Sequence, residues 1–216
     1  ASDPRLVWLL DIIERLGSEK LLLICRSQAK VLALEEVLRT RSGVKVARFH
    51  EGMSLLQRDR NAAYFADAEG ARLLLCSEIG SEGRNFQFAH NLLLWDLPLD
   101  PDLLEQRIGR LDRIGQRHDI MIHACAFSGT AQHALMRWFD NGLDAFRSSP
   151  SDGRELLKRF GGQLVQLAEQ HAHGGHDALL AEHPGRGVQE ELQDGPFPLG
   201  QVQGRVTEPG PMGFFI

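Results

Sequence analysis

Three polar side chains between residues 106 and 113 have the types and the spacing that can grip phosphate. On a helix, Gln106, Arg110 and Arg113 are four and three positions apart, so they would share one face. Guanidinium groups on one face suit a planar, bidentate grip on phosphate oxygens, and arginine stays charged at any working pH. An arginine supplied by a neighbouring lobe can accelerate phosphoryl transfer by roughly 10³–10⁵. The alternative interpretation is a solvated amphipathic helix with a few surface arginines.

The elements that must position this stretch alternate between helix and strand from residue 5 to about 147. Apolar residues at helical spacing, with capping residues before them, predict helices at 5–16, 28–41, 54–67, 100–111 and 130–146. Short apolar runs predict strands buried on both faces at 21–25, 44–49, 73–76, 92–95 and 120–127. Strict alternation with apolar strands indicates an α/β fold, a parallel sheet with helices on both faces.

Ligands of such folds bind at the loops beyond the carboxyl ends of the strands. We therefore expect chemistry at the loops that follow Cys25, Phe49, Cys76 and Trp95. The three cysteines, of which Cys125 is the third, lie in apolar strands and are expected to be core residues of a reduced, intracellular protein.

Composition limits how nucleic acid could be bound. The chain has 24 Lys+Arg and 29 Asp+Glu, for a net charge of −5, so contacts must come from a few placed groups and backbone amides. No run of apolar residues is long enough to predict a membrane span. His171, His173 and His176 have no cysteine or carboxylate pattern beside them, so no metal site is predicted.

We divide the chain into three parts. Residues 1–150 form the α/β domain, 151–171 a helical extension, and 172–216 a Gly/Pro-rich tail without a periodic apolar face. Such a tail cannot offset the entropy of ordering, so we expect it to be mostly disordered or loosely packed. The chain begins at Ala1 without an initiator Met, which suggests a fragment.

Four ordered segments resemble the motifs of superfamily-two helicases. Residues 105–116 resemble motif six, and the ending Arg113-Ile114-Gly115-Gln116 is similar to the SWI/SNF-type branch. Residues 21–28 lie where motif four should be, 49–54 are similar to the family's His/Asp-x-Gly-x-Ser turn, and 77–86 match motif five, over a resemblance spanning about 5–147. Asp96 and Pro101 fall where the family has its Asp and Asn-Pro. The sequence around Asp96-Leu97-Pro98 resembles that of bacterial SWI/SNF-type ATPases associated with RNA polymerase.

The resemblance implies a RecA-like three-layer sandwich and a role for each motif residue. Arg110 and Arg113 would be arginine fingers that reach the γ-phosphate of ATP, and the nucleotide would also be approached by Gln106, Gly83 and Asn85. The backbone of the nucleic acid would be contacted by Arg26, Ser27, His50, Gly52, Ser77 and Gly80. Taken singly, these residues are also common as helix caps and turns.

The sequence lacks a Gly-x-x-x-x-Gly-Lys-Ser/Thr phosphate loop and an acidic pair for Mg²⁺. We therefore expect half of a composite site, in which an N-terminal RecA-like lobe holds ATP and Mg²⁺ and this lobe alone is inactive. The resemblance implies double-stranded DNA or DNA/RNA complexes and RNA polymerase as partners, in the bacterial cytoplasm. Two alternatives remain: a truncated, non-catalytic interaction module, and an RNA helicase lobe, which Arg107 favours and Gln116 disfavours.

Overall fold

A computed structural model describes residues 3–78, 85–127 and 130–147, together with residues 155, 158, 159, 161 and 162 and the backbone of 199–202. Its elements in chain order are α1 (Pro4–Arg15), β1 (Leu21–Cys25), α2 (Gln28–Arg41), β2 (Val46–Phe49), α3 (Leu55–Ala66), β3 (Leu73–Ser77), β4 (Asn91–Leu94), α4 (Pro101–Ile108), β5 (Met121–Phe127), α5 (Ala131–Arg137), the π-helical turn η1 (Trp138–Gly142) and β6 (Leu199–Val202).

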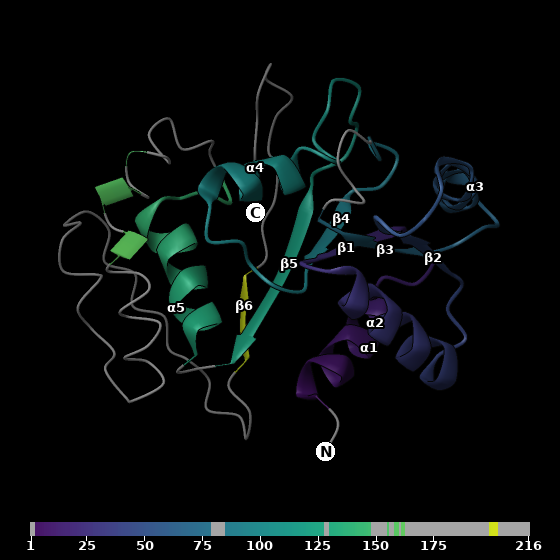
Figure 1. Cartoon of the computed structure of the whole chain (residues 1–216), viewed down its shortest axis with the longest axis horizontal. Coiled ribbons are helices and arrows are strands. Elements are labelled where there is room, and N and C mark those ends of the chain that lie inside the picture. The colour runs from purple at the N-terminus through teal and green to yellow at the C-terminus, as the bar shows by residue number, and fades with distance from the viewer. Residues whose placement is uncertain are drawn as a thin grey trace.

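The strands form one sheet in the order β2-β3-β1-β4-β5-β6 (Figure 1). The first five are parallel, and β6 pairs antiparallel with β5 at the edge. Because β1 lies at the centre, the ends of β2, β3, β1 and β4 open side by side at one edge of the sheet. This is the edge at which the sequence predicts chemistry.

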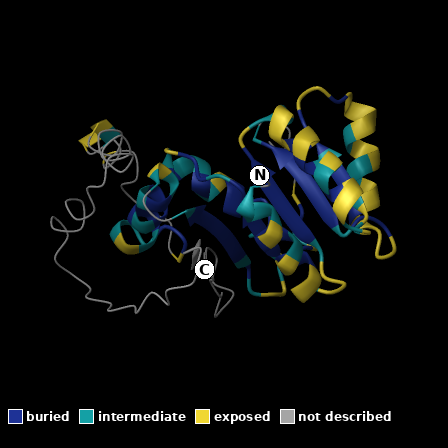
Figure 2. Ribbon diagram, turned by 90° about the horizontal axis from the view of Figure 1, so that it is seen from below, coloured by how far each residue is buried: buried dark blue, intermediate teal, exposed yellow. Residues whose placement is uncertain are grey.

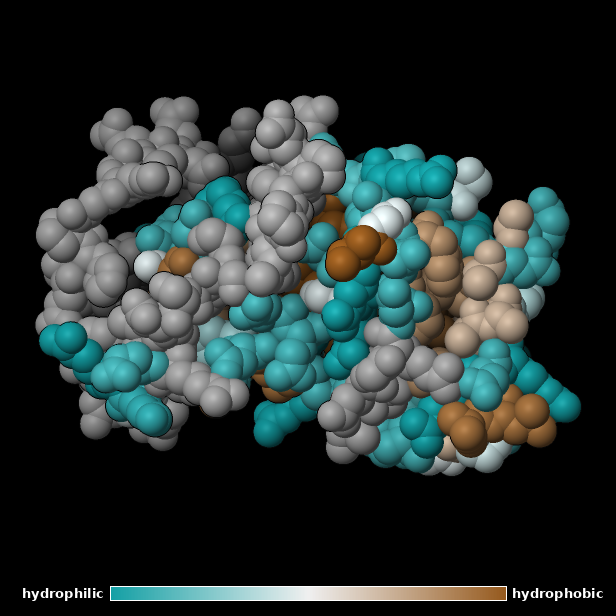
Figure 3. All heavy atoms as spheres, turned by 90° about the horizontal axis from the view of Figure 1, so that it is seen from above, coloured by the Kyte–Doolittle hydropathy of each residue, from teal (hydrophilic) through white to brown (hydrophobic). Residues whose placement is uncertain are grey.

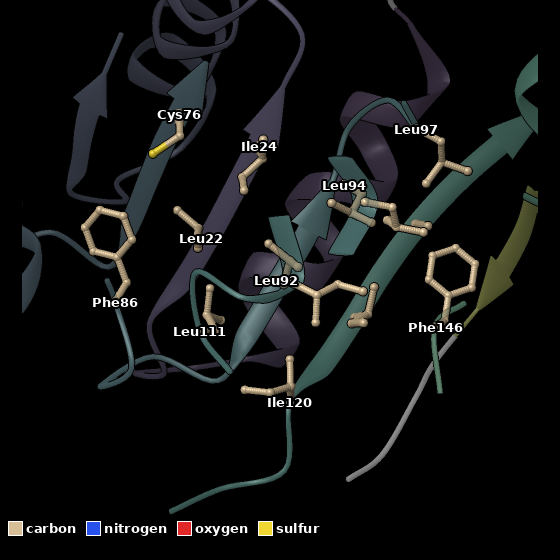
Figure 4. Packing of buried hydrophobic residues seen from close by; sticks show 14 of the residues in the cluster. Leu22, Ile24, Cys76, Phe86, Leu92, Leu94, Leu97, Leu111, Ile120 and Phe146 are labelled. Carbon is tan, nitrogen blue, oxygen red and sulfur yellow. The ribbon is translucent and has the colours of Figure 1, made fainter. Parts of the chain in front are cut away.

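Two hydrophobic cores confirm the three-layer arrangement. Leu22 and Ile24 of β1 point into a core covered by α3, α4, α5 and η1 (Figure 4). The alternate residues of β1 point into a second core, which α1 and α2 cover. All five residues of β1 are buried, whereas the exposed residues lie on the outer sides of the helices (Figure 2). The predicted α/β, RecA-like fold with helices on both faces is therefore correct.

Local sequence signals explain where the helices begin. Ser54 and Gln57 form the predicted capping box of α3, with bonds of 3.3 and 2.9 Å between side chain and backbone. Asp100 caps α4 by accepting a hydrogen bond from the backbone N–H of Asp102, and Pro101 occupies the first helical position. The same logic places Asp3 before Pro4 at the start of α1.

Two predicted helix ends are wrong. We predicted a helix to Leu111, but α4 ends at Ile108, where Gly109 is a weak helix former and i→i+3 bonds tighten the chain. We predicted another helix to 146, but α5 ends at Arg137 and passes into η1, in which the Leu143 N–H bonds to the Trp138 carbonyl five residues back.

Strand β6 lies in the Gly/Pro-rich stretch, where the sequence predicted no strand. Its backbone pairs with β5 over four residue pairs, from Ala124 with Val202 to Phe127 with Leu199. Residues 163–198 and 203–216, which include His171, His173 and His176, lie outside the described residues. Within the described part of the chain, no helix is long and apolar enough to cross a membrane.

Candidate functional site

Hydrogen bonds between loops tie the carboxyl ends of the strands together. The backbone N–H of Arg26, after β1, donates to the Asp96 carboxylate, after β4, at 3.0 Å. The Ser77 hydroxyl, at the end of β3, donates to the Glu51 carboxylate, after β2, at 2.5 Å. Segments that are 26 and 70 positions apart in sequence therefore share one edge of the sheet.

Glu51 links three of these segments. The Ser77 hydroxyl is the main cause that lowers the pKa of the Glu51 carboxyl, and backbone N–H groups of Glu51 and Gln28 lower it further. Gln28 is the first residue of α2, so the carboxylate lies at the positive end of that helix. Gly52 lies against the Gln28 side chain, whose amide would be 2.7 Å from an added Cβ.

Arg107 forms the most buried polar contacts of this edge. Its side chain is 2% exposed and pairs with Glu78, whose two carboxylate oxygens accept from Nε at 3.1 and 3.0 Å. Its Nη1 donates to the backbone carbonyl of Asp96, and Nη2 lies 3.4 Å from the Asp96 carboxylate. From the sequence, Arg107 was used only to compare two branches of the family, and Glu78 and Glu51 were not identified as site residues. Each of these carboxylates comes directly after or within two residues of a buried strand end, which was the signal that could have identified them.

Arg110 and Arg113 do not share a helical face, so that prediction is wrong. Both follow the end of α4, and the Arg110 N–H bonds back to the Arg107 carbonyl at 3.2 Å. Arg110 is 8% exposed. Burial raises the pKa of the Cys76 thiol, and the nearby positive charge of Arg110 opposes that rise. Arg113 is exposed, as is Gln106. One of the two guanidinium groups is thus mostly enclosed in this lobe, and the other faces outward.

A hydrogen-bonded turn holds Arg113 at the surface. The Gln116 N–H bonds to the Arg113 carbonyl at 2.9 Å, and Gly115 between them has φ +102°, which L side chains rarely adopt. The Gln116 side chain donates to the carbonyls of Ala89 and Leu111 and accepts from the backbone after it. Gln116 therefore fixes the loop, a role that sequence reasoning missed.

Asn85 lies next to this turn. Its side chain bonds to Gln87 twice, at 3.0 Å each, so it shapes a local loop. The next residue, Phe86, donates its N–H to the Arg110 carbonyl at 2.8 Å, which joins the end of the predicted motif five to motif six. Gly83 and Gly80 lie outside the described residues.

Ser27 and His50 each have a structural role in this lobe, which would explain these residues without any contact to nucleic acid. Ser27 caps α2 by accepting from the Lys30 N–H at 3.4 Å, which leaves its hydroxyl hydrogen able to donate. His50 is buried, and this burial lowers the pKa of its imidazole. Arg26 is exposed beside them. Contact of these residues with nucleic acid stays a prediction.

On the described part of the face drawn in Figure 3, hydrophilic residues predominate and hydrophobic ones gather in several groups. Exposed large hydrophobic residues of the described part include Leu55, Leu56, Phe88 and Ile114.

The three cysteines are buried and free, as predicted. Among the described residues, no cluster of His, Cys, Asp or Glu could hold a metal ion.

Comparison with known proteins defines the class. The family model of the helicase conserved C-terminal domain matches residues 5–115, and the chain belongs to this family. The model of the RNA polymerase recycling family C-terminal region matches residues 119–195. The resemblance therefore extends well past residue 147, and our prediction that it stops there is wrong.

The relatives are RNA polymerase-associated proteins. RapA of Pseudomonas aeruginosa (strain LESB58) is 53% identical over 192 residues, which cover 88% of this chain and 20% of that protein. RapA of Proteus mirabilis (strain HI4320) is 55% identical over 180 residues, or 82% of this chain and 19% of that protein. The chain thus spans about a fifth of the length of these relatives. It is a SWI/SNF-type C-terminal lobe close to RapA, as its motifs predicted.

A solved structure supports the fold. The crystal structure of the C-terminal part of the Fun30 ATPase domain matches with a TM-score of 0.58 at 18% identity, over 79% of this chain and 55% of that one. At this identity the likeness shows the fold alone, and it agrees with the RecA-like sheet described above.

Proposed function

We propose that this chain is the second motor lobe of an ATP-dependent nucleic-acid translocase of the SWI/SNF type, within an RNA polymerase-associated factor of the bacterial cytoplasm. The observation that carries the proposal is the Arg107 cluster, in which Arg107 contacts Glu78 and Asp96. Asp96 also accepts the backbone N–H of Arg26, so these contacts join the segments that resemble motifs four, five and six at one edge of the sheet. The likeness to RapA proteins supports RNA polymerase as a partner.

Donors on α4 and on the turn that follows it fit a nucleotide held by another lobe. Exposed Arg113 and Gln106 present guanidinium and amide donors suited to phosphate oxygens, and Arg110 lies in the turn between them. When bound, ATP supplies the phosphoryl group that is transferred to water, with Mg²⁺ held by the N-terminal lobe. Arg113 would stabilise negative charge that develops on that group, and Arg110 would hold the turn while adding positive charge behind it. Asn85 and Gly83 would shape the neighbouring loop.

The sequence contains neither a phosphate loop nor an acidic pair for Mg²⁺. Hydrolysis therefore requires closure of this lobe against the lobe that carries them, and this chain alone is inactive. Closure would step the enzyme along duplex DNA or a DNA/RNA complex without strand separation.

Nucleic acid would lie along the loops after β1, β2 and β3. Ser27 and backbone amides at Gly52 and Gly80 would donate to phosphate oxygens without reading sequence. The Ser77 hydroxyl is buried and donates to Glu51, so Ser77 would instead hold the loop after β2 in place. Arg26 adds an exposed positive charge. His50, which is buried, would support the loop after β2. With a net charge of −5, binding depends on these placed groups. Because they make only a small number of phosphate contacts, the affinity of this lobe for nucleic acid should fall only modestly as salt rises.

The test is ATP hydrolysis by the full-length protein with no nucleic acid, with duplex DNA and with single-stranded RNA. We expect duplex DNA to give the larger stimulation. Greater stimulation by RNA would instead favour the RNA helicase lobe that Arg107 suggested. No hydrolysis under any condition would contradict the motor function and leave a non-catalytic interaction module.

A further inference from the structure

The buried side chain of Arg107 contacts the ends of two strands at once. Its guanidinium pairs with Glu78, directly after β3, and with the backbone and carboxylate of Asp96, after β4. At 2% exposure this cation depends on those partners, because an enclosed charge is costly to leave without them. Displacing any one partner therefore disturbs the others.

The same partners lead outward to the loops proposed to contact nucleic acid. Asp96 also accepts the backbone N–H of Arg26, at 3.0 Å. Glu78 directly follows Ser77, whose hydroxyl bonds to Glu51. A phosphate that draws Arg26 toward it would pull on the Asp96 carboxylate. A phosphate that shifts the loop at Ser77 would move Glu78, its neighbour in the chain.

In the other direction, Arg107 leads to the proposed arginine fingers. Its carbonyl accepts the Arg110 N–H at 3.2 Å, and the Arg110 carbonyl accepts from Phe86 at 2.8 Å. Only two residues separate Arg110 from Arg113. A movement of the Arg107 backbone would therefore also move the turn that carries Arg110 and Arg113.

We propose that Arg107 is a positioning residue that couples nucleic-acid binding at the strand ends to the placement of Arg110 and Arg113. The inference rests on the function proposed above and deepens it, since it names how binding at one part of the lobe raises turnover at another. Arg107 itself touches neither ATP nor nucleic acid in this account. It acts because its planar fork holds Glu78 and Asp96 together, which a lysine ammonium cannot reproduce.

The test uses full-length protein with the substitution Arg107→Lys, which keeps the charge and removes the fork. Glu78→Gln provides a second variant that keeps the shape of the partner and removes its charge. The matched control is Arg117→Lys, an exposed arginine on the loop beyond the turn. ATP hydrolysis is measured with and without duplex DNA, together with DNA affinity and the melting temperature.

We expect both variants to lose about tenfold of the DNA-stimulated rate, within the usual range of coupling between sites, while the unstimulated rate and DNA affinity change by less than about threefold. The control should retain wild-type stimulation. Wild-type stimulation in Arg107→Lys would overturn the proposal, and so would an equal loss of stimulated and unstimulated rates, which indicates a merely structural role. If the wild-type protein hydrolysed no ATP, the proposed function would fail and the coupling with it.

Discussion

His123 is a buried imidazole on β5, and neither ring nitrogen has a hydrogen-bond partner in the described part of the chain. Burial, with a smaller effect of nearby Arg15, lowers its pKa to about 4. An unfolded histidine titrates near 6.5, so protonation favours the unfolded chain. The stability that the neutral ring permits is complete above pH ~6.5 and is lost as the pH falls toward 4.

Replacing His123 with leucine should remove this pH dependence. Between pH 7 and pH 5, the free energy of unfolding should fall by about 2 kcal/mol more in the wild type than in His123→Leu. Urea unfolding of both proteins at the two pH values measures the difference. Equal losses in the two proteins would show that His123 is not the titrating group.

Individual residues also show which contacts could be predicted from the sequence and which could not. The cysteines were correctly expected in the core, because a thiol within an apolar strand has few other places. The partners of Arg107 could not be predicted, because Glu78 and Asp96 lie 29 and 11 positions away and meet it only through the sheet order. The enclosure of Arg110 was missed for the same reason.

Among the elements, the turn after α4 decides where Arg113 lies. Gly115 at φ +102° is strained for any other residue, and a Cβ there would lie 3.4 Å from the Gln87 side chain. Gly115→Ala should lower the free energy of unfolding by about 1–2 kcal/mol, the usual cost of left-handed backbone. Denaturant unfolding checks this, with Gly43→Ala as the control, since nothing lies within 4 Å of a Cβ at Gly43. A loss no larger than that of the control would show that the turn relaxes without cost.

The existence of elements was predictable, and their ends were less so. Apolar strands and capping residues such as Ser54 correctly gave the parallel sheet and the helix starts. The early end of α4 was missed, because a regular spacing of Gln106, Arg110 and Arg113 continues past the point where the helix stops. Strand β6 was missed since its pairing with β5 depends on a contact across more than 70 residues.

At the scale of the whole molecule, the chain is one lobe of a proposed two-lobe machine. Its described edge brings three motif segments together, and the matched segment covers 20% of the relative from Pseudomonas aeruginosa. Residues 119–195 match a family region named for RNA polymerase recycling, which supports a polymerase partner for the complete protein. In the proposed function, opening and closing of the two lobes would bring these residues to the nucleotide.

In the function proposed above, Arg113 reaches across the cleft to the transferring phosphate. The maximal ATPase rate of full-length Arg113→Ala with duplex DNA tests this role. Arg117→Ala, which removes another exposed arginine four positions along, is the matched control. We expect Arg113→Ala to lose at least about 10³-fold in kcat with little change in ATP affinity, and the control to hydrolyse ATP at the wild-type rate. A kcat for Arg113→Ala within a few-fold of the wild type would contradict the account.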